Sequence, residues 1–296
     1  MQQHDDSARS GPSPPLHLQP GSPTWPKEFN DIEAPPSDLW LAGKIELLSL
    51  RPRVAIVGSR SPSAYGLEQA CRFARALARR GAVIVSGLAR GIDQAAHLGA
   101  LDEGGATIAV LGCGVDRPWP TGEVSTRLLR EGLLLSEFPP GQAPRRHHFP
   151  LRNRLISGLS SGVLVVEAAR KSGSLITAKW ALSQGRHVWA LPGRVDQPMA
   201  RGTHSLIRDG AMPVESPEEL IEDFLGVGAP TETARQTSFV LPYSVLLDAL
   251  QGETLSADEL AQRLGWDVGR TLAELANFEL DGFLRRGPGG LYTLLQ

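Results

Sequence analysis

The chain has 296 residues, enough for one sizeable domain and a smaller one, with 41% hydrophobic and 21% charged residues, as in ordinary globular proteins. No apolar run approaches the roughly 20 residues of a membrane helix, and the N-terminus lacks a signal peptide's apolar core, so we expect a cytoplasmic protein. The formal net charge of -2 says little about partners, so any anion binding must come from a local cluster of cations.

Strands and helices alternate along most of the chain. Residues 1–30 are rich in Pro, Ser and Gly and are expected to form a disordered tail. The strands expected after it are "RVAIVGSR", "AVIVSG", "ATIAVLGCG", "LLLSEFPPG", "GVLVVEA" and "HVWALPG". The helices expected between them are "YGLEQACRFARALARRG", "GIDQAAHLGALDEGG", "STRLLREG", a helical turn "NRLISGLS", and "SLITAKWALSQG". Continuous apolar strands alternating with helices predict a doubly wound α/β domain with a mostly parallel sheet over residues 31–225.

The end of the chain has a different pattern. The segment 203–225 adds a helix, a short strand and a helix that starts at Ser216, and 226–240 is expected to be a linker. Residues 241–296 contain three helical segments, "YSVLLDALQ", "SADELAQRLG" and "DVGRTLAELANFELDG", followed by a hairpin around Gly-Pro-Gly-Gly. Three helices and a hairpin predict a small winged-helix domain.

Ligands of doubly wound sheets bind at the carboxyl ends of the strands, so each loop there is a candidate site. In "VGSRSPSAYG", Gly58 would let the backbone approach a ligand, Ser59 offers a hydroxyl, and Arg60 offers a guanidinium suited to phosphate. In "RKSGSLITAK", two cations and Ser172-Gly173-Ser174 converge on a helix N-terminus, which favours an anion. Both loops therefore predict phosphate contacts.

A third loop, "SGLARGID", points the other way. Asp93 opens a helix there, where a carboxylate serves as a cap or first-turn acid and disfavours phosphate. Asp93 and His97, four residues apart, could also be an acid–base pair, although a helix cap beside a packed histidine is the simpler interpretation. Standard nucleotide fingerprints are missing, because "LGCGVDRP" has Arg117 at the third glycine position, so we expect no cofactor.

The segment from Gly141 to Val166 holds four arginines and two histidines but no acid. The histidines have no nearby third ligand, and the two cysteines, Cys71 and Cys113, lack metal-ligand spacing, so no metal site is expected. Cations beside Phe149 suit single-stranded nucleic acid, because charges follow the backbone and aromatic rings stack on bases.

These residues carry a resemblance to a known family. "AIVGSRSPSAYG", "SGLARGIDQAAH", "AVLGCGVDRPWP", "FPLRNRLISGLS" and "VVEAARKSGSLITA" resemble blocks of the DNA-processing protein A (DprA/Smf) family. The resemblance implies an extended Rossmann-like domain that binds single-stranded DNA without catalytic activity. It also implies a bacterial protein of natural transformation that protects incoming strands, loads RecA recombinase and forms a homodimer through this domain.

The candidate DNA contacts come from matching these blocks. They are Gly58, Ser59, Arg60, Arg145, Arg146, Phe149, Arg152, Asn153, Arg154, Ser172, Gly173, Ser174 and Lys179. One departure from the family pattern is Thr121, which stands where a basic residue usually follows the Tyr-Pro of the "GVDxxYP" block. A cation contact is therefore not expected at that position.

Two other functions remain open from the sequence. A phosphoribohydrolase of the lysine-decarboxylase-like group resembles this fold, but "SGSLITAKWA" has no carboxylate to act as its general base. A sequence-specific transcription factor would use the winged helix, but residues 241–296 carry eight acids and four arginines, a balance that repels duplex DNA. We expect that domain to contact protein, with weak DNA contact through Arg285 and Arg286 as the alternative.

Overall fold

The structure of the protein, a computed structural model, describes residues 14–225, 246, 249–250, 254–280 and 284–294. The chain divides into two compact units, Met1–Ala229 and Pro230–Gln296. The linker predicted at 226–240 lies outside the described residues, as do residues 1–13 of the predicted tail.

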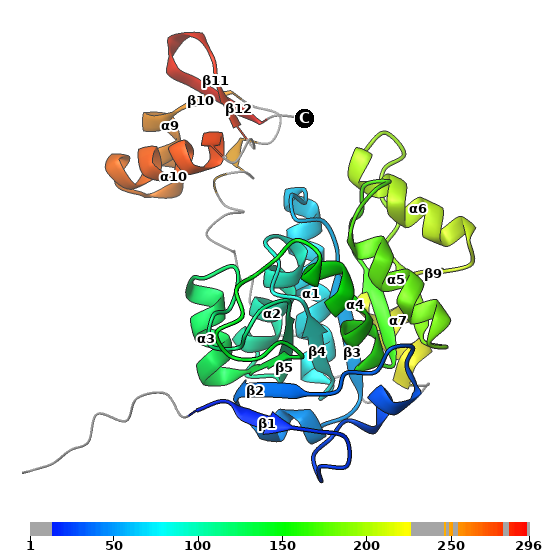
Figure 1. Ribbon diagram of the computed structural model, residues 1–296. Helices are drawn as coiled ribbons and strands as arrows, with labels where there is room; N and C mark the ends of the chain where they lie inside the picture. Colours follow the sequence, from blue (N-terminus) through cyan, green and yellow to red (C-terminus); the bar gives the residue numbers. More distant parts are fainter. Residues whose placement is uncertain (1–13, 226–245, 247–248, 251–253, 281–283, 295–296) are drawn as a thin grey trace, which may run out of the picture. The chain divides into compact units, whose positions relative to one another are not determined.

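The first unit is built on one large sheet (Figure 1). Its parallel strands are, in spatial order, β6 (Leu133–Ser136), β5 (Thr107–Leu111), β4 (Val83–Ser86), β3 (Arg53–Val57), β7 (Gly162–Val165), β8 (His187–Ala190) and β9 (Met212–Pro213). The chain runs outward from β3 through β4, β5 and β6, then returns to place β7 on the other side of β3. The direction of winding therefore reverses between β3 and β7, and the predicted doubly wound, mostly parallel α/β fold is confirmed.

Helices cover both faces of the sheet because alternate strand residues point to opposite sides. One face packs against α1 (Ala64–Arg79), α2 (Ile92–Asp102), α3 (Glu123–Glu131) and α7 (Pro217–Leu225). The other face packs against α4 (His148–Gly158), α5 (Ser174–Ser183) and α6 (Arg201–Arg208), with the short 3-10 helix η3 (Pro198–Ala200) before α6. In β3, for example, Val54 and Ile56 face the first layer, whereas Ala55 and Val57 face the second.

The N-terminal segment corrects the predicted tail. Strand β1 (Leu16–Leu18) pairs with β2 (Leu39–Gly43), which pairs antiparallel with β6 and extends the sheet. Two 3-10 helices follow these strands, η1 (Lys27–Asp31) and η2 (Ile45–Ser49). Residues 14–32 belong to the folded unit, because four of their large apolar side chains are buried in its core, namely Leu18, Trp25, Phe29 and Ile32.

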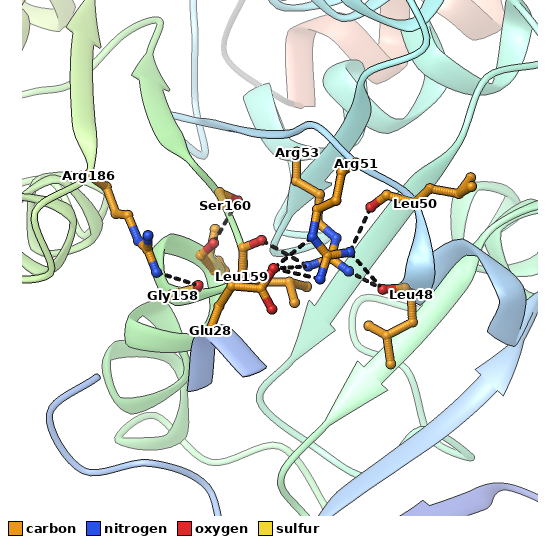
Figure 2. A network of polar contacts seen from close by, with 10 residues as sticks. Glu28, Leu48, Leu50, Arg51, Arg53, Gly158, Leu159, Ser160 and Arg186 are labelled. Atoms are coloured by element: carbon orange, nitrogen blue, oxygen red, sulfur yellow. Dashed lines mark hydrogen bonds and ion pairs between the residues drawn. The ribbon is translucent and has the colours of Figure 1, made fainter. Parts of the chain in front are cut away.

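A partly buried polar network joins this segment to the amino end of β3 (Figure 2). Arg53, the first residue of β3, is fully buried; its guanidinium donates to the carbonyls of Leu48 and Leu159 and pairs with Glu28 at 3.3 Å. Glu28 also accepts from Arg51 at 2.7 Å. Burial, helped by the nearby Arg51 charge, lowers the pKa of Arg53 to about 9. The network therefore ties η1, η2 and the end of α4 to the amino end of β3.

The described part of the second unit contains a three-stranded sheet and two helices. Its elements are β10 (Leu255–Ser256), α9 (Ala257–Leu264), α10 (Val268–Leu280), β11 (Leu284–Arg286), the 3-10 helix η4 (Pro288–Gly290) and β12 (Leu291–Leu294). A capping box fixes the start of α9, where Ser256 and Glu259 exchange hydrogen bonds. The predicted second and third helices and the hairpin are confirmed, whereas the first helix lies mostly outside the described residues.

Candidate nucleic-acid interface

A pocket of about 490 Å³ opens where the sheet reverses, at the carboxyl ends of β3 and β7. We call it the switch-point pocket. Nine of the predicted contact residues line it, namely Gly58, Ser59, Arg60, Phe149, Arg152, Asn153, Ser172, Gly173 and Ser174. Three segments that are far apart in the sequence therefore meet here, because the carboxyl ends of parallel strands share one edge of the sheet. The other four predicted residues, Arg145, Arg146, Arg154 and Lys179, are not among its lining residues.

The loop after β3 supplies the most accessible cation of the pocket. Arg60 is exposed, and its guanidinium lies 5.3 Å from the centre of the Phe149 ring, a cation–π distance. The ring is half-buried and covers Gly112 at the end of β5. Arg60 is thus held beside an aromatic face while its charge stays open to solvent.

Gly58, the first glycine of this loop, is required by close packing as well as by its place at the pocket. A Cβ at Gly58 would lie 2.6 Å from Cγ1 of Ile92 and 2.9 Å from the carbonyl oxygen of Glu167. The glycine is therefore required for close packing between the loop and α2, in addition to its place in the pocket wall. Ser59 is buried, and its hydroxyl accepts from the Ser61 amide at 3.1 Å.

The acid-free segment forms a helix over most of its basic residues, and this separates their roles. Helix α4 begins at His148, earlier than the predicted turn at Asn153. At 3.6 residues per turn, Phe149, Arg152 and Asn153 share one face, which lines the pocket. Arg154 points elsewhere. The expected strip of phosphate contacts is therefore broken by the helical period.

Arg152 lines the pocket but is held by hydrogen bonds within the protein, so its predicted DNA contact is not included in the interface that we propose. Only 2% of it is exposed, and its guanidinium donates to the carbonyls of Gly87 at 2.7 Å and Val110. Arg152 thus bridges the carboxyl ends of β4 and β5. Burial lowers its pKa to about 10, an effect that the nearby Asp93 carboxylate opposes.

Arg154 is likewise held by partners within the protein, so its predicted DNA contact is not included in the proposed interface. Both of its terminal nitrogens pair with Glu137 at 2.6 Å, and Nε donates to the carbonyl of Ala34 at 2.8 Å. Nη1 also donates to the carbonyl of Leu151 at 2.9 Å, so four of the five guanidinium N–H groups bond within the protein, in a residue that is 5% exposed. The acid-free stretch draws its counter-charge from outside itself, from the loop after β6.

The loop before α5 forms another wall of the pocket. Ser172 and Ser174 lie with their hydroxyls 2.7 Å apart, and Gly173 between them is exposed with no atom within 4 Å of a would-be Cβ. Asn153 donates from its side chain to the carbonyl of Gly173 at 3.2 Å and so joins α4 to this loop. The amides of Ser174 and Leu175 already donate to Ser172, so the groups suited to a phosphate here are the two hydroxyls at the N-terminus of α5.

The remaining predicted cations are exposed but lie outside the pocket lining. Arg145 and Arg146 precede α4, and Lys179 lies on α5. In the described part of the chain, the ion pairs engage His17 or other arginines, and none includes Arg60, Arg145 or Arg146. These three charges therefore stay available for an external anion.

Asp93 and His97 do not form an acid–base pair. Oδ2 of Asp93 accepts from the amides of Gly87 at 3.1 Å and Ala89 at 3.3 Å, as a carboxylate in the first turn of α2 should. Nδ1 of His97 meets Oγ1 of Thr107 at 2.7 Å, and burial lowers the pKa of His97 to about 3. Burial also raises the pKa of Asp93, against the nearby Arg152 charge. Each group has a structural partner of its own.

Glu167 is a residue whose position the sequence analysis missed. Its carboxylate accepts from the amide of Ser63 at 2.8 Å and the hydroxyl of Ser63 at 2.5 Å, at the amino end of α1. That helix end follows the first strand of the winding, where an anion would be favoured. The chain's own carboxylate occupies it, so phosphate must be held elsewhere. In the sequence, the only indication of a special role for Glu167 is that it is the first acid after the acid-free segment.

Within the residues that the structure describes, no group of three or more His, Cys, Asp or Glu side chains is arranged to hold a metal ion. His148 instead stacks on Phe138 at 4.0 Å and meets the carbonyl of Gly112 at 3.0 Å. Among the helices of the described ranges, none has the length and apolar character to span a membrane.

Known proteins share both units of the chain. The family model described as DNA recombination-mediator protein A matches residues 17–225, and the DprA winged helix domain matches residues 230–290. Protein Smf of Escherichia coli (strain K12) is 41% identical over 293 residues, which cover 95% of this chain and 78% of that protein. The DNA processing protein DprA of Bacillus subtilis (strain 168) is 43% identical over 68% of this chain and 67% of its own length.

Two solved structures each resemble 71% of this chain. DNA processing protein A from Streptococcus pneumoniae has a TM-score of 0.68 and 40% identity, covering 71% of this chain and 74% of that one. The Helicobacter pylori protein, whose structure concerns its single-stranded DNA binding mode, has a TM-score of 0.65 and 34% identity, covering 71% of this chain and 95% of that one. Since the family model covers well over half of the residues, this chain belongs to the DNA recombination-mediator protein A family.

Proposed function

We propose that the chain binds single-stranded DNA at the switch-point pocket and along the exposed cations beside it. The observation that carries the proposal is the convergence of Arg60, the Phe149 ring and the Ser172–Ser174 loop on one pocket. The solved Helicobacter pylori relative, described as binding single-stranded DNA, supports it.

The chemistry of the pocket suits a phosphodiester chain more than a free nucleotide. Arg60 offers a guanidinium for one phosphate, and the N-terminus of α5 offers the hydroxyls of Ser172 and Ser174 for a second. Phe149 gives an aromatic face on which a base can stack, a contact that any base can make. Arg145 and Arg146, both exposed, extend the positive surface for further phosphates.

The finer role follows from the family. We propose that the protein protects incoming strands, loads RecA recombinase onto them and acts as a homodimer, as the resemblance implies. The winged helix is proposed to contact protein, since α10 carries Glu274 and Glu279 and Asp267 lies just before it. A role in loading requires a strand held by its backbone with bases available for pairing, which fits phosphate contacts without chemistry on the strand.

The binding test compares cations inside and outside the proposed interface. Arg60→Glu combined with Arg146→Glu should weaken binding of a labelled single strand and flatten its salt dependence by roughly 0.7 per neutralised contact. Arg130→Glu on α3, whose side chain is 68% exposed, is the matched control and should bind normally. Fluorescence anisotropy at several salt concentrations gives both quantities. Normal binding by the double variant would refute the interface.

A phosphoribohydrolase is the alternative to be excluded by experiment. The first turn of α5 has no acidic residue, and the carboxylate of Asp93 in the pocket already accepts two backbone hydrogen bonds. The pocket therefore lacks an uncommitted carboxylate to act as the general base of glycosidic hydrolysis. Release of ribose 5-phosphate from nucleoside monophosphates would overturn the binding-only proposal.

A further inference from the structure

A second pocket of about 520 Å³ lies next to the switch-point pocket on the same edge of the sheet. Its lining residues include Tyr65, Val166, Glu167, Leu191, Pro192 and Arg194. The same three loops build both pockets, since the chain after β3, after β7 and around η3 contributes to each. The amide of Ser59 bonds to the carbonyl of Glu167 at 2.7 Å, so the walls are joined.

The second pocket is unsuited to phosphate. The Glu167 carboxylate, in a residue 8% exposed, lies in its wall and already occupies the amino end of α1. Arg194, the one cation of the lining, pairs with Asp196 at 2.7 Å. A second anion would meet an unscreened carboxylate without a free cation to balance it.

The lining instead suits a flat, neutral ring. Val166, Leu191 and Pro192 form an apolar wall, and Tyr65, which is 50% exposed, offers an aromatic face. Two of the roughly four acceptor positions of the Glu167 carboxylate are taken by Ser63. The remaining positions can accept from an exocyclic amino group, which adenine, cytosine and guanine carry and thymine lacks.

We propose that the second pocket holds one base of the strand whose phosphates lie in the switch-point pocket, and that it favours a base with an exocyclic amino group. The proposal rests on the proposed function, because a neighbouring pocket can receive a base only from a strand that is already bound. Tyr65 would stack on the base, and Glu167 would both accept from its amino group and exclude phosphate.

The first experiment uses an eight-nucleotide thymidine strand with one central 2-aminopurine, whose fluorescence falls when it stacks on an aromatic ring. At saturating full-length protein, we expect the emission to fall with the native chain and with Tyr65→Phe, and to recover with Tyr65→Ala. The affinity of Tyr65→Ala should drop roughly tenfold, as for loss of one base–aromatic stack. Equal quenching by Tyr65→Ala and the native chain would overturn the proposal.

The second experiment measures the base preference by competition between eight-nucleotide cytidine and thymidine strands. The native chain should bind the cytidine strand several-fold more tightly, and Glu167→Gln, which keeps an acceptor for Ser63, should bring the ratio towards one. Equal affinities in the native chain would overturn the preference. If the native chain binds no strand even at low salt, the proposed function fails and this pocket with it, whereas binding without quenching removes the pocket alone.

Discussion

The contrast between Arg154 and Arg60 gives the sharpest test of the site, because the sequence placed both in one set of DNA contacts. Arg154→Ala removes a guanidinium that pairs through two nitrogens with Glu137 at 2.6 Å, in a residue 5% exposed. The Glu137 side chain, 13% exposed, is left as a largely buried charge without its partner. Breaking such a pair costs about 3–5 kcal/mol of unfolding free energy.

The loss is measured by urea denaturation followed by tryptophan fluorescence. With a slope of roughly 3 kcal/mol per M, at the upper end of the range for small proteins, the midpoint should fall by about 1 M or more. Arg60→Ala is the control, because the side chain is exposed and surface substitutions usually change stability by less than about 0.5 kcal/mol. At a temperature where both variants are folded, only Arg60→Ala should lower the salt slope of strand binding, by roughly 0.7.

The opposite behaviour of the two variants would refute these assignments of Arg154 and Arg60. An Arg154→Ala protein with an unchanged midpoint and a reduced salt slope would show that Arg154 contacts phosphate rather than Glu137. An Arg60→Ala protein with an unchanged slope would remove the exposed cation from the interface.

Two further predictions concern buried positions. His97, with its pKa lowered by burial from 6.5 to about 3, binds a proton more readily unfolded, so stability is complete above pH 6.5 and declines as the pH falls below it. Urea midpoints should show a loss of roughly 3 kcal/mol between pH 6.5 and 4 that His97→Gln lacks, and parallel profiles would contradict this. Gly58→Ala would place a Cβ 2.6 Å from Ile92 and should cost about 1–3 kcal/mol without changing the salt slope of binding. Unchanged thermal stability of that variant would show that the loop can move aside.

Much of the site was predictable because local patterns determine where a parallel sheet presents its loops. The apolar segments from Val54 onward predicted the strands of the parallel sheet in chain order. The loops at the carboxyl ends of β3 and β7 carry the serines and Arg60 that line the pocket. A strand or helix can be predicted from the period of its apolar residues, because that period depends only on residues close together in the sequence. The N-terminal strands were missed because β1 has three residues and lies among prolines and serines.

By itself, the sequence determined the alternation of buried strands and helices and the chemistry of the loops between them. Only the tertiary structure decided which cations face solvent. Arg152 and Arg154 belong to the same basic segment as the exposed Arg145 and Arg146. Arg152 nevertheless donates to carbonyls at the ends of β4 and β5, and Arg154 pairs with Glu137. Glu167 reaches the start of α1 from 104 residues away. Whether a charge is open or paired depends on burial and on partners distant in the chain, and the composition of a segment contains neither.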